Sequence, residues 1–173
     1  MSDWKQTLTE LARDRFVSLK RQAFLLCGDD DQAEDLVQDA LVRAFARPLR
    51  TPGPGEAAAY VRVTMVNLFI DGERRRSRWN RAAPLLTGAE TIKDPIEQIL
   101  DRNVMLAALN DLPRQQRACV ILRFYLDLPI TQVAFELGVA EGTVKGYLSE
   151  AMTRLAAQLS SAGGQSIERG HTQ

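Results

Sequence analysis

The apolar residues of this chain recur at the three-to-four-residue spacing of amphipathic α-helices over most of its length. The extended alternation of apolar and polar residues that marks β-strands is absent. Gly28, Pro48 and Gly138 each follow the end of an apolar stripe, where such residues end helices. The pattern predicts an all-α fold, with helices over about residues 9–26, 29–47, 56–78, 96–109, 113–126, 130–137 and 141–159.

Two segments interrupt the helical pattern. The sequence TPGPGE at 51–56 predicts a loop, because proline and glycine dominate it. Residues 80–95 show no clean period and hold two prolines and a glycine, which indicates an interdomain linker. We therefore expect two small helical domains at 9–80 and 96–160, a flexible linker at 81–95 and a disordered polar tail at 161–173.

Charge is balanced overall but is distributed unevenly along the chain. The 22 basic and 22 acidic residues give a net charge of zero, which argues against a protein that coats nucleic acid by bulk charge. Residues 29–39 carry six acids and no base, and Asp29, Asp30 or Asp31 is expected to cap the helix that follows. Residues 74–81 carry five arginines and no acid. One acidic and one basic surface indicate two different partners.

Chemistry-bearing residues are sparse. Cys27 and Cys119 form no CxxC or disulfide spacing, so we expect single buried thiols in a reducing compartment. The polar N-terminus and the lack of a long apolar run predict a cytoplasmic protein without a membrane span. The only histidine is His171 in the tail, and no Ser/His/Asp set or phosphate-binding glycine loop occurs. We expect no metal, no cofactor and no enzymatic activity.

A helix-turn-helix is predicted at 130–155. Gly138 supplies the tight turn, Val139 fills the space between the helices, and small Ala134 lets them approach. The second helix is expected to bury Val144, Leu148, Ala151 and Leu155. Its opposite face suits a DNA major groove and carries Thr143, Lys145, Gly146, Tyr147 and Ser149. The alternative is a plain helical hairpin with a solvated polar face.

Three segments together resemble a known family. They are AEDLVQDALVRAF at 33–45, NLFIDGERRRSR at 67–78, and the run from ALNDLPRQQR to SEAMTRL at 108–155. In this order and spacing they are similar to extracytoplasmic-function (group 4) sigma factors of the sigma-70 family, within the actinobacterial SigE-type branch. The resemblance covers roughly residues 10–160 and implies a sigma-2 and a sigma-4 domain joined by a flexible linker.

The resemblance implies a role for each segment. The first would bind the clamp coiled coil of the RNA polymerase β′ subunit, through Asp35, Leu36, Gln38, Asp39 and Arg43. The second would open and recognise the −10 promoter element, through Asn67, Asp71, Arg74, Arg75, Arg76, Arg78 and Trp79. The sigma-4 helix-turn-helix would recognise the −35 element and contact the β flap. An anti-sigma factor that holds both domains is implied as well, and exposed apolar side chains around Leu36, Leu41, Val120 and Ile121 are candidate contacts for it.

The residues themselves fit promoter opening, with alternatives. Arginines can follow the phosphates of a single strand, and Trp79 can stack on an unpaired base or instead pack beneath the linker. Asn67 can bond a base or an internal group, and Asp71 can pair with an arginine one turn later. The acidic 29–39 face is by itself more typical of plain solvated surface, and only the resemblance favours a binding role for it.

Two positions depart from the family pattern. Ala140 stands where Ser or Thr often caps the recognition helix, and Glu150 stands near the place of an arginine. A carboxylate that faces phosphate would weaken the −35 contact, so we expect Glu150→Arg to raise promoter affinity. Two other function classes remain open: a helix-turn-helix regulator that binds duplex DNA alone as a dimer, and a sigma mimic that binds a protein partner and ignores DNA.

Overall fold

The computed structural model describes residues 4–47, 54–80 and 98–167, and over them the chain is helical without a strand. The all-α prediction is thereby confirmed. The expected linker at 81–95 lies outside the described residues, as does the first half of the loop expected at 51–56. The second half of that loop, Pro54–Glu56, is helical. The elements are α1 (Trp4–Cys27), α2 (Asp30–Ala46), α3 (Pro54–Asn80), α4 (Gln98–Asn110), α5 (Arg114–Val120), the π-helix η1 (Ile121–Tyr125), α6 (Ile130–Leu137) and α7 (Glu141–Ile167).

The junction of α1 and α2 follows from two adjacent residues. Gly28 has a φ of +75°, in the left-handed region that glycine tolerates, and its N–H donates to the carbonyl of Phe24 at 2.7 Å. The Asp29 carboxylate accepts from the Gln32 N–H at 2.8 Å. Asp29 is therefore the N-cap among the three aspartates, and Asp30 and Asp31 lie in the first turn, where the helix dipole favours acids.

Helix α1 begins at Trp4, earlier than the sequence pattern predicts. The Trp4 indole is 6% exposed and its Nε1–H donates to the carbonyl of Ala44 at 2.8 Å. Its ring also meets Tyr60 edge-on, with 5.9 Å between centroids. These partners lie on α2 and α3, so periodicity within the first helix does not reveal them.

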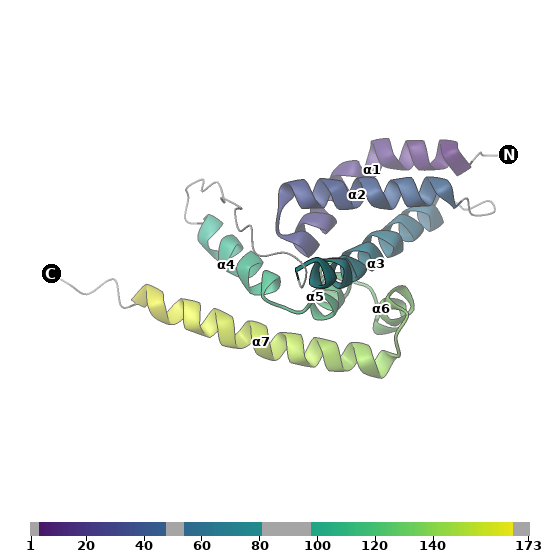
Figure 1. Cartoon of the computed structure of the whole chain (residues 1–173). Coiled ribbons are helices and arrows are strands. Elements are labelled where there is room, and N and C mark those ends of the chain that lie inside the picture. The colour runs from purple at the N-terminus through teal and green to yellow at the C-terminus, as the bar shows by residue number, and fades with distance from the viewer. Residues whose placement is uncertain (1–3, 48–53, 81–97, 168–173) are drawn as a thin grey trace.

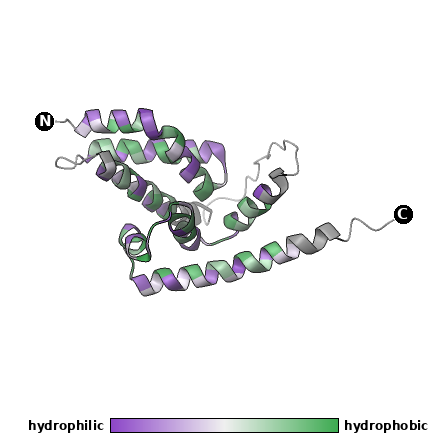
Figure 2. Ribbon diagram, turned by 180° about the vertical axis from the view of Figure 1, so that it is seen from behind, coloured by the Kyte–Doolittle hydropathy of each residue, from purple (hydrophilic) through white to green (hydrophobic). Residues whose placement is uncertain are grey.

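The first three helices pack side by side as one bundle (Figure 1). The buried face of α2 consists of Ala33, Val37, Ala40 and Ala44, all 0% exposed. Such small side chains let α1 and α3 approach α2 closely. Figure 2 shows hydrophobic and hydrophilic residues alternating along each helix, as amphipathic packing requires.

The second half forms the predicted helix-turn-helix. Helix α6 ends at Leu137, Gly138 takes a φ of +64°, and the Val139 N–H donates to the Ala134 carbonyl at 3.0 Å. Val144, Ala151 and Leu155 of α7 are buried and Leu148 is partly buried, as expected. Helices α4 and α5 pack along α7, which spans the lower edge of the molecule in Figure 1.

Two further helical segments differ from the expected ones. The single helix expected over 113–126 changes to a π-helix at Ile121, where the Leu126 N–H donates to the Ile121 carbonyl five residues back at 3.0 Å. Helix α7 continues to Ile167, so the disordered tail expected at 161–173 is wrong for its first residues. The hydroxyls of Ser160 and Ser161 donate to carbonyls about one turn back, at 2.8 Å each, as serines within a helix commonly do.

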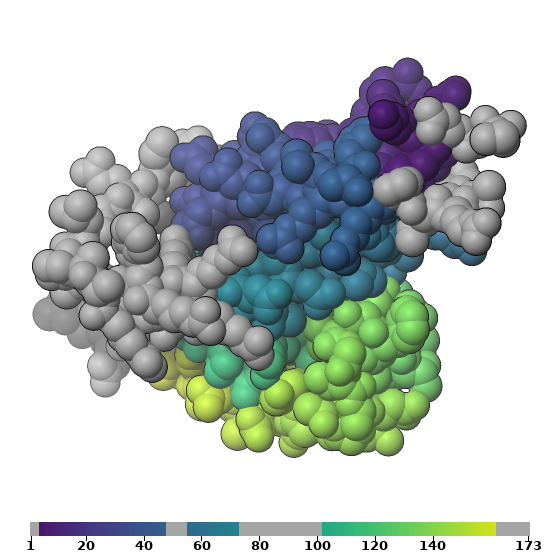
Figure 3. All heavy atoms as spheres, turned by 45° about the vertical axis from the view of Figure 1, so that its right-hand side comes forward, coloured from purple at the N-terminus to yellow at the C-terminus, as the bar shows by residue number. Residues whose placement is uncertain are grey.

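The two halves are in direct contact. Helix α3 packs against α5 and α6, and α1 packs against α4, α5 and η1. One cluster of buried residues runs through both halves and contains Phe69 together with Cys119, Leu122 and Val133. Figure 3 shows teal α3 wedged between blue α2 and the green helix-turn-helix. Among the described residues, no helix is both long and apolar enough to cross a membrane.

Candidate functional site

Helix α2 turns a charged face away from the core. Three alanines and Val37 are buried at helical spacing on one face of α2, and Asp35, Gln38, Asp39 and Arg43 on its other side are exposed. Leu36, the fifth residue expected there, is partly buried against the core. All five positions of the first predicted site thus lie on one helix.

The exposed face of α2 also holds two apolar side chains that sequence reasoning missed. Val42 is 66% exposed and Phe45 is 36% exposed. The available signal was their position, since Val42 interrupts the polar stripe of an otherwise amphipathic helix. Exposed apolar residues beside charged ones are typical of a protein-binding surface.

The second predicted site lies on α3. Asn67 and Asp71 are exposed, and the helix is continuous through Asn80. The five further positions of this site lie on the same helix but their side chains are outside the described residues: Arg74, Arg75, Arg76, Arg78 and Trp79. The alternatives for Trp79 and for a partner of Asp71 among these arginines therefore stay open.

The third predicted site lies on α7. Lys145, Gly146 and Ser149 are exposed, while Thr143 and Tyr147 are partly buried. The Tyr147 hydroxyl donates to Oε1 of Gln115 at 2.7 Å, so its polar end is occupied within the protein. The recognition face is thus narrower than the sequence suggests.

Ala140 and Glu150, the two positions that depart from the expected pattern, have different surroundings. The Ala140 carbonyl accepts from the N–H groups of Thr143 and Val144 at 3.0 and 3.2 Å, and its methyl side chain has no atom that could cap the helix. The Glu150 carboxylate accepts from the Gln116 side chain at 2.7 Å, and Gln116 is only 5% exposed. Glu150 therefore accepts the N–H of a buried side-chain amide in addition to carrying charge at the surface.

Family models match both halves of the chain. Residues 13–80 match "Sigma-70 region 2" and residues 102–155 match "Sigma-70, region 4". The chain belongs to the sigma-70 family. Within it, the chain is an extracytoplasmic-function sigma factor of the type named SigE and SigL in actinobacteria, and it serves in promoter recognition and the initiation of transcription by RNA polymerase.

Relatives of similar length support this assignment. The chain is 34% identical to the RNA polymerase sigma-E factor of Streptomyces avermitilis over 152 residues, which cover 88% of this chain and 84% of that one. It is 34% identical to the ECF RNA polymerase sigma factor SigL of Mycobacterium tuberculosis over 150 residues, covering 84% of each. The sigma factor RpoE of Bartonella quintana, solved in complex with the anti-sigma factor NepR, is similar with a TM-score of 0.69 and 28% identity, over 92% of this chain and 98% of that one.

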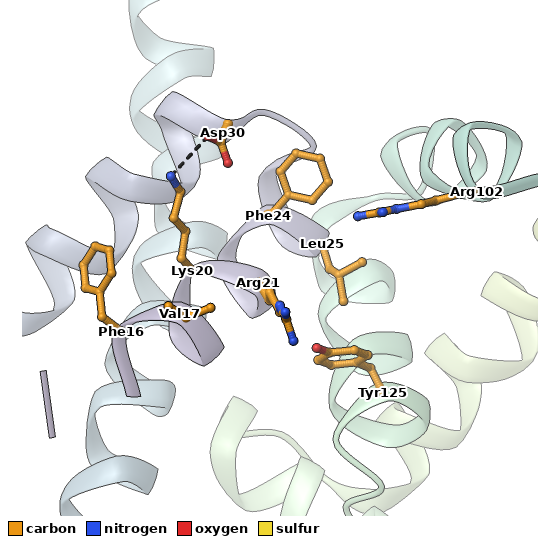
Figure 4. Close-up of a pocket in the computed structure, with 9 residues that line it drawn as sticks. All are labelled: Phe16, Val17, Lys20, Arg21, Phe24, Leu25, Asp30, Arg102 and Tyr125. Carbon is orange, nitrogen blue, oxygen red and sulfur yellow. Dashed lines mark hydrogen bonds and ion pairs between the residues drawn. The ribbon is translucent and has the colours of Figure 1, made fainter. Parts of the chain in front are cut away.

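This sigma factor also has a groove at the seam of regions 2 and 4 that the sequence did not reveal. It has a volume of about 610 Å³, and Figure 4 shows side chains from α1, α4 and η1 around it. Apolar side chains form much of the lining, with cations among them. The lining residues are Phe16, Val17, Lys20, Arg21, Phe24, Leu25, Asp30, Arg102 and Tyr125.

The cations of the groove differ in their partners. Lys20 lies 3.1 Å from the carboxylates of both Asp30 and Glu34, and its hydrogen bonds to them raise the pKa of Lys20. Arg21 and Arg102 are exposed and form no ion pair with the described residues. The groove therefore combines an apolar lining with available positive charge.

The apolar contacts expected for an anti-sigma factor need correction. Val120 and Ile121 are 8% and 3% exposed, so they are core residues and not surface. Leu36 and Leu41 are partly buried against the same core. The exposed aromatic residues in the described part of region 4 lie elsewhere, at Phe124, Tyr125 and Phe135. Phe124 and Tyr125 lie at the end of η1 and are 58% and 50% exposed.

The two cysteines of the sigma factor are not joined in a disulfide. Cys27 is partly buried and Cys119 is buried. Burial raises the pKa of the Cys119 thiol to about 12, which makes it unreactive at neutral pH. In the described part of the chain, no cluster of three or more His, Cys, Asp or Glu residues is arranged to hold a metal ion.

Proposed function

We propose that the charged face of α2 binds the clamp coiled coil of the polymerase β′ subunit. The polar contacts would come from Asp35, Gln38, Asp39 and Arg43. Leu36 would contribute an apolar contact at the edge of the core beneath them. The exposure of all four polar side chains on one helix supports this role. Val42 and Phe45 extend the surface with apolar area that a helical partner can bury.

The end of α3 would bind the −10 element. Asn67 and Asp71 are candidates for contacts to an unpaired base, and the arginines at 74–76 and 78 would follow the phosphates of the strand. Trp79 would serve as a stacking platform. The energy for opening the duplex would come from binding, without hydrolysis of ATP and without a catalytic residue.

The recognition helix α7 would lie in the major groove of the −35 element. Lys145 and Ser149 are available for phosphate or base-edge contacts, and Gly146 lets the backbone approach the DNA. Thr143 would contribute from the first turn. Tyr147 would contact DNA only after releasing Gln115. Region 4 would also contact the β flap.

These roles assign the domains as the sequence suggests, with residues 9–80 as sigma-2, 81–95 as linker and 96–160 as sigma-4. Because promoter DNA and polymerase are cytoplasmic partners, we expect the protein to act there. We further propose that an anti-sigma factor binds this protein. The groove of Figure 4 would bind an apolar helix of the anti-sigma factor. Acidic residues at the edge of that helix would form ion pairs with Arg21 and Arg102.

The observation that carries the proposal is the pairing of an exposed, charged α2 with a complete helix-turn-helix in one chain. The test is transcription with purified core polymerase and a pool of genomic promoters, with and without this protein. New start sites that share spaced −35 and −10 elements support it. Binding to core without new transcripts would indicate a mimic, and binding to duplex DNA alone as a dimer would indicate a stand-alone regulator.

Residue assignments need a matched pair of variants. Asp39→Lys reverses charge on the proposed clamp surface and should weaken core binding at least tenfold. Asp14→Lys reverses an exposed acid on α1, outside the proposed surfaces, and should leave core affinity unchanged. Equal core affinity for both variants would refute the assignment of α2.

A further inference from the structure

The groove at the seam of regions 2 and 4 follows the length of α1. Its lining residues on this helix form three pairs that lie about one turn apart: Phe16 and Val17, Lys20 and Arg21, Phe24 and Leu25. A rise of about 1.5 Å per residue makes this strip about 14 Å long. Arg102 of α4 and Tyr125 of η1 face it from region 4 (Figure 4). The groove therefore suits an extended occupant.

The outer turns of this strip are apolar and within reach of solvent. Val17 is 66% exposed, and Tyr125 on the other side of the groove is 50% exposed. Phe16, Phe24 and Leu25 are partly buried against the core. Covering such apolar area is favourable, and the groove volume of about 610 Å³ lies within the range of small-molecule sites. The groove can therefore bury an aliphatic chain.

Positive charge is in excess among the lining residues. Three of them are cations, and the one acid is Asp30. Asp30 lies 3.1 Å from Lys20, which also pairs with Glu34. Lys20 and its acids compensate each other, so the charge that remains for an occupant is that of Arg21 and Arg102.

Arg21 and Arg102 approach the groove from different helices. Figure 4 shows Arg21 reaching from α1 toward Tyr125, and Arg102 reaching from α4 toward Leu25. The positions one turn before and after Arg21 hold no acid. Both arginines are exposed, and neither forms an ion pair with the described residues. An anion between them would bind both guanidinium groups, whose donors match the oxygens of carboxylate and phosphate.

We propose that this groove binds an anionic amphiphile, an unbranched aliphatic chain that carries one carboxylate or phosphate group. The head group would lie between Arg21 and Arg102, with the Tyr125 hydroxyl as a further donor. The chain would lie against the apolar turns of α1. Because the lining comes from both regions of the chain, neither region alone provides the site.

The same groove is proposed above for an apolar helix of an anti-sigma factor. The two occupants would use the same apolar lining and the same arginines, so a bound amphiphile would exclude the helix. Only this exclusion rests on the proposed function. The ligand site rests on the lining and is tested on the isolated protein.

Isothermal titration of the whole chain with sodium decanoate tests the site, at fixed salt and below the concentrations at which micelles form. We expect saturable one-to-one binding. Decyl phosphate has the same chain and compares the two anionic head groups. Decyltrimethylammonium, which carries a cation on that chain, should bind at least tenfold more weakly. Hexanoate should also bind at least tenfold more weakly, because each buried methylene contributes about fourfold in affinity.

Substitutions test the position of the head group. Arg21→Gln and Arg102→Gln remove the charge from exposed side chains, and each should weaken decanoate binding three- to tenfold. Tyr125→Phe removes only the hydroxyl and should weaken it about twofold. Arg15→Gln, at an exposed arginine of the same helix outside the groove, is the matched control and should leave the affinity unchanged. Circular dichroism checks that each variant retains its helices.

A photoreactive probe tests the position of the chain. A decanoate with a diazirine at its chain end, illuminated in complex with the protein, should label groove-lining residues such as Phe24 or Leu25. Mass spectrometry identifies the labelled residues, and excess decanoate should suppress the label. This reading does not depend on the charge variants.

The outcomes decide the proposal. Absence of saturable binding by both anionic probes overturns the ligand site, and binding of an acidic amphipathic peptide in their place would assign the groove to a protein helix. Equal affinity for the cationic probe, unchanged affinity in both arginine variants, or label confined to residues outside the groove overturns it as well. Tighter binding of either anionic probe supports the site and identifies its head group. None of these readings involves polymerase or promoter, so failure of the proposed function would leave them unchanged.

Discussion

Arg117 of α5 donates a hydrogen bond to the main-chain carbonyl of Leu26 at the end of α1, 91 residues earlier in the chain. The same guanidinium donates to the Asn110 side chain at 3.2 Å and to the main-chain carbonyls of Asn110 and Leu112. Arg117 is only 8% exposed. One buried cation therefore fixes the end of α1 and the α4–α5 turn in a single geometry.

Replacing Arg117 should be costly. Arg117→Ala removes a donor from several buried carbonyls at once, and each unsatisfied group costs about 1–3 kcal/mol. We expect the free energy of unfolding to fall by about 3 kcal/mol in urea titrations. Arg117→Lys should recover only part of this, because a single ammonium cannot reproduce the planar fork. A loss below about 0.5 kcal/mol for Arg117→Ala, the range of ordinary surface changes, would contradict this account.

Two left-handed glycines should differ in their tolerance of a side chain. A Cβ at Gly28 would overlap the side-chain amide of Asn110, which Arg117 binds, whereas a Cβ at Gly138 would meet nothing within 4 Å. Both have a positive φ, so alanine at either position costs about 1–2 kcal/mol in backbone strain. We expect Gly28→Ala to lose about 1 kcal/mol more than Gly138→Ala in thermal or urea unfolding. Equal losses would mean that Asn110 moves aside freely.

The buried thiol predicts a pH dependence at the alkaline end. The pKa of Cys119 is raised from 9.0 to about 12 by burial, so the folded protein holds this proton more tightly than the unfolded chain does. Its contribution to stability is complete below pH 9.0 and is lost as pH rises toward 12. Unfolding measured over this range should show a steeper loss in the native protein than in Cys119→Ala. Parallel curves would exclude the effect.

The same burial predicts the order of thiol labelling, which checks the Cys119 environment independently. At pH 8, a maleimide should modify the partly buried Cys27 first, and Cys119 only at the rate at which the protein unfolds. Labelling of Cys119 at a rate independent of denaturant would show that the site opens locally.

Glu150 should respond in two ways to substitution. Glu150→Arg is expected to raise affinity for −35 duplex DNA, because a carboxylate near phosphate is replaced by a cation. The same change removes the acceptor of the Gln116 amide and should lower stability by about 1 kcal/mol. Glu150→Gln keeps an acceptor while removing the charge, and should give a smaller gain in affinity with little loss in stability. A titration at fixed salt that shows no gain in either variant would disprove the idea that Glu150 opposes DNA binding.

Several features of the fold could be predicted from local sequence. Asp29 and Gly28 specify the end of one helix and the start of the next through bonds within a few residues. The turn at Gly138 and the buried stripe from Val144 to Leu155 follow in the same way from spacing along one helix. Such features depend on neighbours at i+3 and i+4, which the sequence displays directly.

Other features could not be predicted because their partners are distant. Trp4 precedes the predicted start of the first helix and is held by Ala44 and Tyr60. Val120 and Ile121 are predicted at the surface, but Val120 is buried with residues of α4 and α7, and Ile121 lies in the cluster shared by both halves of the chain. For the arginines after Gly72, the sequence supplies the charge, and their contacts stay a prediction.

The sequence by itself therefore determined the all-α class, most helices, the helix-turn-helix and membership of the sigma family, since each rests on periodicity or on motifs within one segment. Only the tertiary structure decided that Glu136 is buried against Arg62 and that Arg114 and Arg117 bind the carbonyls of another domain. In sequence, charged residues on a helix indicate a solvated face. Burial of a charge is set by which surfaces meet, and a partner 74 residues away supplies the compensating charge.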